Sequence, residues 1–177
     1  MTMRNQRVII IIGSRRDLGF AAPIGRVLQS FGVDYEYRVA SAHKTPRELM
    51  NLLGEYEQSR ESVVYITVAG MSNALSGLVD ANTKHPVIAC PPYSEKFGGA
   101  DIYSSLRTPS GVAPLVVLNP ENAALAAIKI LGLENPTLSE KVYRFQLEKK
   151  KEVNTADEEV KGKKVSDLEK KLAEAEQ

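Results

Sequence analysis

Three short polar segments hold the residues best suited to chemistry, and each follows a run that resembles a strand. They are Gly13 to Asp17, Ser41 to Pro46 and Ala69 to Asn73. The second segment contains His43, one of only two histidines, followed directly by Lys44. An imidazole can accept and return a proton near neutral pH, and a lysine can bind a phosphate group. This segment therefore predicts a site that combines proton transfer with anion binding.

Each segment also has a plainer interpretation. A strand, a polar turn and a helix aim backbone N–H groups at a phosphate, but Ser14 or Asp17 could equally cap the helix. The turn fits neither G-x-G-x-x-G nor G-x-x-x-x-G-K-[ST]. His43 could lie in a loop that only starts a helix, with Thr45 as its cap and Pro46 in its first turn. The small residues after Val68 could admit a ligand or allow tight packing.

The surrounding elements predict an α/β fold. Four apolar runs and one run of alternating character, residues 34–39, are typical of strands, and segments with helical spacing separate them. The expected strands are 8–12, 34–39, 63–68, 87–90 and 113–118, and the expected helices are about 18–31, 46–56, 74–83, 102–106, 119–131 and 136–152. This alternation predicts a three-layer α/β/α, flavodoxin-like parallel sheet in the order 2-1-3-4-5, with an extra C-terminal helix.

That strand order brings the three polar segments together. Each follows one of the first three strands, and the carboxyl ends of parallel strands meet at one edge of a sheet. In open α/β sheets, ligands bind at this edge, where the strand order reverses. We therefore expect Ser14 and Asp17, the His43 segment and the Gly70 to Asn73 segment to face one crevice.

Composition narrows the class of protein. The chain has 177 residues and a net charge of +1, which favours neither nucleic acid nor an anionic membrane as a partner. Cys90 is the only cysteine, so no internal disulfide can form and a cytoplasmic location is expected. The apolar run 8–12 is too short for a signal peptide or a membrane span. His85, which precedes a proline, is expected to be an ordinary surface histidine, and two distant histidines and one cysteine predict no metal site.

A change in charge density predicts the domain organisation. From residue 148 to residue 177, 17 of 30 residues are charged. We expect residues 1–147 to form the catalytic domain and 148–177 to form a charged tail that is helical or disordered. Val165, Leu168, Leu172 and Ala175 have coiled-coil-like spacing, but over too few heptads to predict one.

Taken in order, the three segments resemble a known family. Gly-Ser-x-x-Asp, Ser-Ala-His-Lys-Thr-Pro and Ala-Gly-x-Ser-Asn follow the first three strands, as in the phosphoribosylaminoimidazole (AIR) carboxylase family of purine biosynthesis. The resemblance covers about residues 7–147. It implies a flavodoxin-like domain that assembles as a homo-octamer, with active sites at subunit junctions.

The family contains two classes of enzyme. One is a mutase that acts on N-carboxyaminoimidazole ribonucleotide, and the other carboxylates AIR directly with carbon dioxide, without ATP, to give 4-carboxy-AIR (CAIR). The chain resembles the direct carboxylases, because the mutases typically have an arginine in place of Lys44 and a histidine in place of Ala74. Ser72-Asn73, Cys90-Pro91-Pro92 and the segment from Ser104 to Gly111 also resemble the carboxylase class.

The resemblance assigns roles to residues. It implies that His43 is catalytic, and that substrate is bound by Ser14, Asp17, Ser41, Lys44, Gly70, Ser72 and Asn73. Arg16 and Met71 depart from the family pattern, which usually has serine and often arginine there. The implied substrates are AIR and carbon dioxide, and no cofactor is expected. The alternatives are the mutase and, more remotely, a non-enzymatic flavodoxin-like binding module.

Overall fold

The computed structural model describes residues 5–169. The chain divides into two compact units, residues 1–139 and 140–177. The first unit contains the sheet and the three polar segments that form the candidate site. The boundary predicted at residue 147, between a catalytic domain and a tail, stays a prediction.

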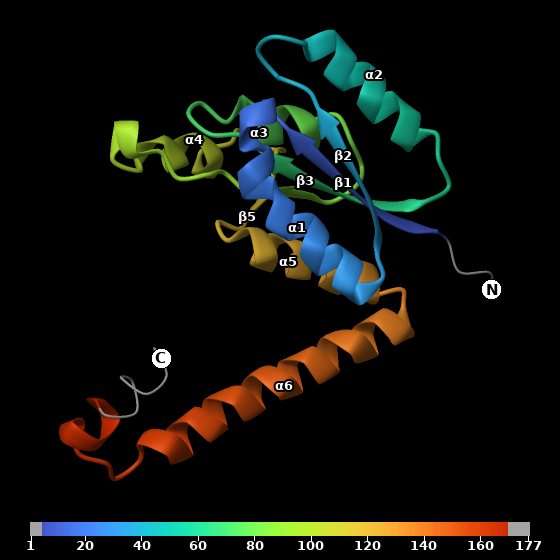
Figure 1. Cartoon of the computed structure of the whole chain (residues 1–177). Coiled ribbons are helices and arrows are strands. Elements are labelled where there is room, and N and C mark those ends of the chain that lie inside the picture. The colour runs from blue at the N-terminus through green and yellow to red at the C-terminus, as the bar shows by residue number, and fades with distance from the viewer. Residues whose placement is uncertain (1–4, 170–177) are drawn as a thin grey trace. The chain divides into compact units, whose positions relative to one another are not determined.

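The first unit is built on a five-stranded parallel sheet in the order β2-β1-β3-β4-β5 (Figure 1). This confirms the predicted strand order. The strands are β1 (Gln6–Ile12), β2 (Asp34–Val39), β3 (Ser62–Val68), β4 (Val87–Ala89) and β5 (Leu115–Val116). The helices are α1 (Leu18–Phe31), α2 (Pro46–Glu57), α3 (Ala74–Asp80), α4 (Tyr103–Leu106), α5 (Pro120–Gly132) and α6 (Pro136–Val160).

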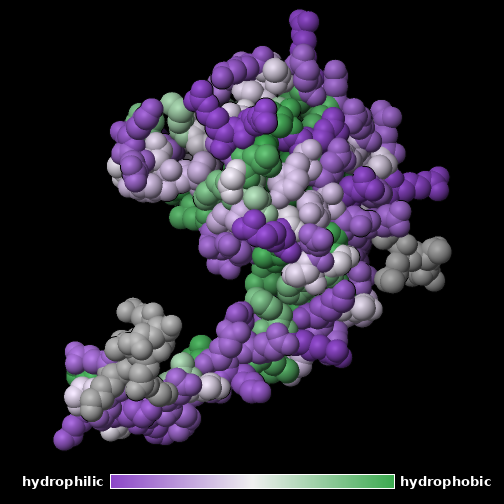
Figure 2. Space-filling view, viewed as in Figure 1, coloured by the Kyte–Doolittle hydropathy of each residue, from purple (hydrophilic) through white to green (hydrophobic). Residues whose placement is uncertain are grey.

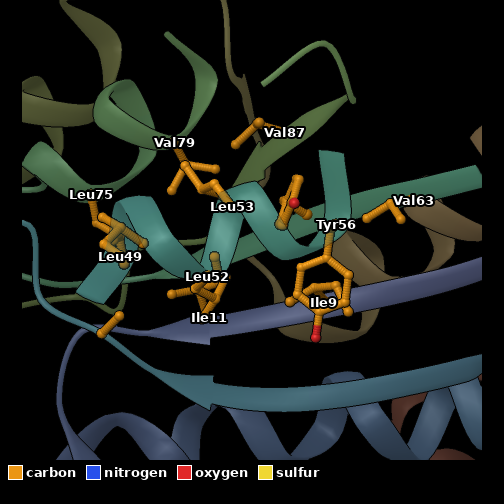
Figure 3. Packing of buried hydrophobic residues seen from close by; sticks show 12 residues of the cluster. Ile9, Ile11, Leu49, Leu52, Leu53, Tyr56, Val63, Leu75, Val79 and Val87 are labelled. Atoms are coloured by element: carbon orange, nitrogen blue, oxygen red, sulfur yellow. The ribbon is translucent and has the colours of Figure 1, made fainter. Parts of the chain in front are cut away.

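Alternation along the strands divides the core between two faces of the sheet. Ile9 and Ile11 of β1 lie on the face that packs against α2 and α3, where Leu49, Leu53 and Val79 are buried (Figure 3). The intervening residues of β1 point to the opposite face, where α1 and α5 contact each other and the strands. The predicted three-layer α/β/α arrangement is therefore confirmed.

Three elements are shorter than predicted: α3, β4 and β5. The fifth strand was expected from residue 113 but begins at Leu115, since the Ala113 N–H donates to the Asp80 carboxylate at 2.7 Å and Pro114 has no N–H. The helix expected to reach Thr83 ends at Asp80. The Thr83 hydroxyl is instead hydrogen-bonded to the Glu57 carboxylate at the end of α2.

The prediction that His85 is a surface histidine is wrong. Only 12% of its side chain is exposed, and its ring lies edge-on to the Tyr65 ring. Its Nε2 atom lies 3.7 Å from a Glu57 carboxylate oxygen. Burial lowers the pKa of His85, the charge of Lys84 lowers it further, and the Glu57 carboxylate opposes both.

In the second unit, α6 continues to Val160, beyond the predicted end at Glu152. Ion pairs one turn apart, such as Lys149 with Glu152 at 2.8 Å, support this charged stretch. Leu172 and Ala175, which share the coiled-coil-like spacing, lie outside the described residues. No helix among residues 5–169 is long and apolar enough to cross a membrane, and hydrophilic side chains cover most of the face in Figure 2.

Candidate active site

The first polar segment turns sharply at the end of β1. The Gly13 N–H donates to the Val68 carbonyl at 2.9 Å, which ties the ends of β1 and β3 together. Ser14 caps a short 3₁₀ turn, Arg15–Asp17, by accepting the Arg16 N–H at 3.3 Å. Asp17 precedes α1 but makes no capping hydrogen bond through its side chain. Ser14 therefore caps the 3₁₀ turn rather than α1, and the Asp17 side chain caps neither.

The second segment is a closed loop that presents His43. The Thr45 hydroxyl accepts the Ser41 N–H at 2.9 Å, and the Ser41 hydroxyl accepts the Lys44 N–H at 3.2 Å. Thr45 occupies the N-cap position of α2 without a side-chain capping bond, so its predicted role as a cap is wrong. Its hydroxyl instead closes the loop, and His43 and Lys44 are exposed within it.

The third segment has an unusual backbone. Met71 has a φ of 60°, and no other non-glycine residue in the described part of the chain has a positive φ. Such a left-handed conformation is unfavourable for a residue with a side chain. A Cβ on Gly70 would lie 3.1 Å from Pro92 Cγ, so packing alone already favours glycine there.

These three segments line one pocket of about 610 Å³. Seven of the eight predicted site residues line it: Ser14, Asp17, Ser41, His43, Lys44, Gly70 and Ser72. The crevice predicted at the carboxyl edge of the sheet is thus present in the structure. It forms because parallel strands end together and because β1 lies between β2 and β3.

Asn73 is the exception among the predicted site residues. It is only 4% exposed and does not line the pocket. Its side-chain oxygen accepts the Ser76 N–H at 3.2 Å, and its side-chain nitrogen donates to the Ser105 hydroxyl at 3.0 Å. Both ends of the Asn73 amide are therefore occupied by the protein, which makes it the N-cap of α3.

The pocket combines positive charge with one unusual carboxyl group. Arg16 and Lys44 supply two cations that can bind a phosphate group. Burial raises the pKa of Asp17, while a backbone hydrogen bond from Ser14 and the charge of Arg16 oppose the rise. An anionic ligand with hydroxyl groups suits this combination, and His43 lies in the same pocket as a group able to transfer protons.

Sequence reasoning missed some residues that line the pocket. Phe97 comes from the connection between β4 and β5, 49% exposed, and is followed by Gly98 and Gly99, both with positive φ. The sign available in the sequence was a phenylalanine directly before two glycines. Leu75 of α3 and Ala42 also line the pocket and offered no comparable sign.

A model of the AIR carboxylase family matches residues 7–152. The chain belongs to this family. It is 56% identical over 155 residues to the phosphoribosylaminoimidazole carboxylase of Archaeoglobus fulgidus, covering 88% of this chain and 85% of that protein. It is 49% identical over 138 residues to the enzyme of that name from Treponema denticola, covering 78% of this chain and 87% of the relative.

Animal relatives in the family are longer. The human bifunctional phosphoribosylaminoimidazole carboxylase/phosphoribosylaminoimidazole succinocarboxamide synthetase is 43% identical over 129 residues, which covers 73% of this chain but 30% of the human protein. Among solved structures, Treponema denticola PurE superposes with a TM-score of 0.86 at 45% identity, covering 88% of this chain and 99% of that one. The family predicted from the three polar segments is thereby confirmed.

Proposed function

We propose that the chain catalyses the reversible, ATP-independent carboxylation of AIR by carbon dioxide to CAIR in purine biosynthesis. Family membership supports the reaction, since close relatives carry the name of this carboxylase. The observation that carries the proposal for this chain is one pocket lined by His43, by the cationic side chains of Arg16 and Lys44 and by small residues of the third loop.

The chemistry needs one base and a place for carbon dioxide. The electron-rich ring carbon of AIR attacks carbon dioxide, forming a carbon–carbon bond and leaving that ring carbon with both a hydrogen and a carboxylate. His43 accepts this proton, which restores the aromatic ring, and returns it in the reverse direction. We expect Gly70 and Ser72 to line the subsite for carbon dioxide and for the developing carboxylate.

The other pocket residues are proposed to hold the nucleotide. Lys44 is a point charge for the phosphate, and Ser14 and Ser41 contribute hydroxyls to the same end of the substrate. The Asp17 carboxylate, which makes no capping bond, can accept hydrogen bonds from ribose hydroxyls. Arg16, which replaces the usual serine, lines the pocket and adds a second cation to the phosphate side. Asn73 is proposed to contribute indirectly, by fixing the loop that ends at α3.

Assembly and location belong to the same proposal. The family resemblance favours a homo-octamer with its active sites at subunit junctions, and the lone buried cysteine favours the cytoplasm. We expect residues 1–147 to supply the catalytic residues. Light scattering of the purified full chain would test the octamer.

A paired substrate assay tests the reaction. One sample contains AIR with a carbon dioxide/bicarbonate buffer, the other contains N-carboxyaminoimidazole ribonucleotide, and formation of CAIR is followed in both at early times. Faster product from AIR, rising with dissolved carbon dioxide, supports the direct carboxylase. Product only from the carbamate would make the chain a mutase, and no product from either, with folded protein, would favour a non-enzymatic binding module.

The role of His43 is tested by His43→Asn. Turnover should fall by about 10² to 10⁴-fold while nucleotide binding stays measurable, because only the proton carrier is lost. His85→Gln is the matched control, since it removes the other histidine of the chain, which does not line the pocket. Near-normal turnover in His43→Asn would rule His43 out as the proton carrier.

A further inference from the structure

The backbone of the Gly70 to Asn73 loop alternates in its hydrogen bonding. The Met71 N–H donates to the Asp101 carboxylate at 3.1 Å, and the Asn73 N–H donates to the Ser104 hydroxyl at 2.9 Å. The N–H groups of Gly70 and Ser72 have no partner within residues 5–169. Both of these residues line the candidate active site. The loop thus directs every second N–H group to the protein and leaves the others for a ligand.

One short segment, residues 101–105, makes all of these contacts. The Ser104 hydroxyl lies 3.1 Å from the Met71 carbonyl and 2.7 Å from the Asp101 carbonyl, either of which can accept its proton. Asp101 and Ser104 are therefore hydrogen-bond partners for the loop at the Met71 N–H, at the Met71 carbonyl and at the Asn73 N–H. Met71 is the residue with the unfavourable left-handed backbone, which persists only where the surrounding structure holds it.

Asp101 and Ser104 do not line the candidate active site. They line a neighbouring pocket of about 410 Å³, which shares Met71, Ser72 and Phe97 with it. Met71 and Ser72 therefore lie between the 101–105 segment and the site. The direct hydrogen bonds from Asp101 and Ser104 toward the site go to this loop, at Met71 and Asn73.

We propose that Asp101 and Ser104 are positioning residues that hold Met71 in its left-handed conformation, so that the Gly70 and Ser72 N–H groups bind carbon dioxide and the carboxylate formed from it. The inference rests on the proposed carboxylase function. It goes further in two ways. It assigns the carbon dioxide subsite to the backbone N–H groups of Gly70 and Ser72, and it assigns the fixed orientation of these groups to two residues outside the pocket. Preorganised donors avoid reorganisation during the reaction, which is why their fixed orientation matters.

The arrangement predicts that the two substrates respond differently. The proposed nucleotide ligands Ser14, Asp17, Ser41 and Lys44 lie on the other two loops. Loosening the Met71 loop should therefore weaken carbon dioxide capture and leave the KM for AIR unchanged. General damage to the fold would instead raise the KM for carbon dioxide and the KM for AIR together.

The test compares variants that keep or remove the hydrogen bonds of Asp101 and Ser104. Asp101→Asn keeps an acceptor for the Met71 N–H, and Asp101→Ala removes it. Ser104→Ala removes the acceptor for the Asn73 N–H together with the hydroxyl donor beside the Met71 carbonyl. We expect the apparent KM for carbon dioxide to rise about fivefold or more in the two alanine variants, the effect of losing at least one hydrogen bond. Asp101→Asn should stay within about twofold of the wild type. Glu95→Gln, which removes an exposed carboxylate from the same connection, is the control and should change nothing.

Three kinetic results would overturn the proposal. They are an unchanged KM for carbon dioxide in both alanine variants, an equal rise in the KM for AIR, or an Asp101→Asn variant as impaired as Asp101→Ala. The last would mean that the negative charge of Asp101 acts in its own right.

Hydrogen–deuterium exchange separates this proposal from the proposed function. A peptide spanning residues 68–76 should exchange faster in Asp101→Ala and Ser104→Ala than in the wild type and Glu95→Gln, whether or not the enzyme turns over AIR. If the wild type has no activity on AIR but the exchange difference is present, the proposed carboxylase function is refuted. The positioning role of Asp101 and Ser104 is then still supported. Unchanged exchange in both alanine variants refutes the positioning role directly.

Discussion

Replacing Asn73 with alanine should destabilise the fold more than the loss of an ordinary helix cap. The Asn73 side chain caps α3 through the Ser76 N–H and also donates to the Ser105 hydroxyl. Ser76 and Ser105 are 1% and 2% exposed, so water cannot readily replace the lost amide. The alanine variant therefore leaves two buried polar groups without their present partner.

The magnitude follows from these two losses. Removing an N-cap costs about 1 kcal/mol, and leaving a buried hydroxyl without its partner costs about 1–3 kcal/mol. We expect the free energy of unfolding to fall by about 2–4 kcal/mol in Asn73→Ala. Asn73→Asp should lose much less, because a carboxylate can accept from both Ser76 and Ser105.

Urea unfolding, followed by circular dichroism at one fixed protein concentration, measures the difference. Asn119→Ala is the matched control: Asn119 caps α5 by accepting the Asn122 N–H at 2.8 Å, and this pair is exposed, so about 1 kcal/mol is expected. Equal losses in the two alanine variants would refute the reasoning from burial. Unchanged stability in Asn73→Ala together with lost nucleotide binding would instead make Asn73 a direct substrate ligand.

Three further predictions concern the rest of the fold. Burial lowers the pKa of His85, so below about pH 6.5 the folded protein binds fewer protons than the unfolded chain. The free energy of unfolding should therefore fall as the pH drops through this value. Urea titrations at several pH values should show a flatter slope in His85→Gln. Cys90 is fully buried and its burial raises its pKa to about 12, so a thiol reagent should label it only after unfolding; rapid labelling of native protein would contradict this. Gly25→Ala should lower the free energy of unfolding by about 1–3 kcal/mol, since its Cβ would clash with the Tyr37 hydroxyl and lie 2.9 Å from Tyr35 Cε2. Tyr37→Phe should restore part of this loss in thermal unfolding. Full additivity of the two changes would argue against the clash.

Local patterns in the sequence were enough to predict the sheet and the three loops. Runs such as Val8 to Ile12 form strands because β-branched residues suit a sheet that is covered on both faces. General rules of chain topology limit the possible orders of those strands, and the flavodoxin-like order was the one predicted among them. His43, Ser14 and Gly70 could be assigned to one crevice because strand ends carry their loops to a common edge.

What the sequence could not supply were contacts between residues far apart in the chain. The bond from Met71 to Asp101 spans 30 residues, and the bond from Asn73 to Ser105 spans 32. Neither bond produces a repeated spacing of residue types in the sequence, because each requires only one suitable side chain at one position. Such contacts therefore cannot be predicted from sequence patterns. For the same reason the burial of His85 against Glu57 and Tyr65 was missed.

The sequence by itself therefore indicated the strands, the family and the residue types around His43, which depend on local patterns and on the order of three short motifs. The strand order was predicted from it and then confirmed by the structure. Only the tertiary structure decided that Asn73 faces the protein interior and that Asp101 and Ser104 hold the Met71 loop. These outcomes depend on how the connection between β4 and β5 folds back onto the end of β3. That geometry is set by packing across the whole domain rather than by any one segment.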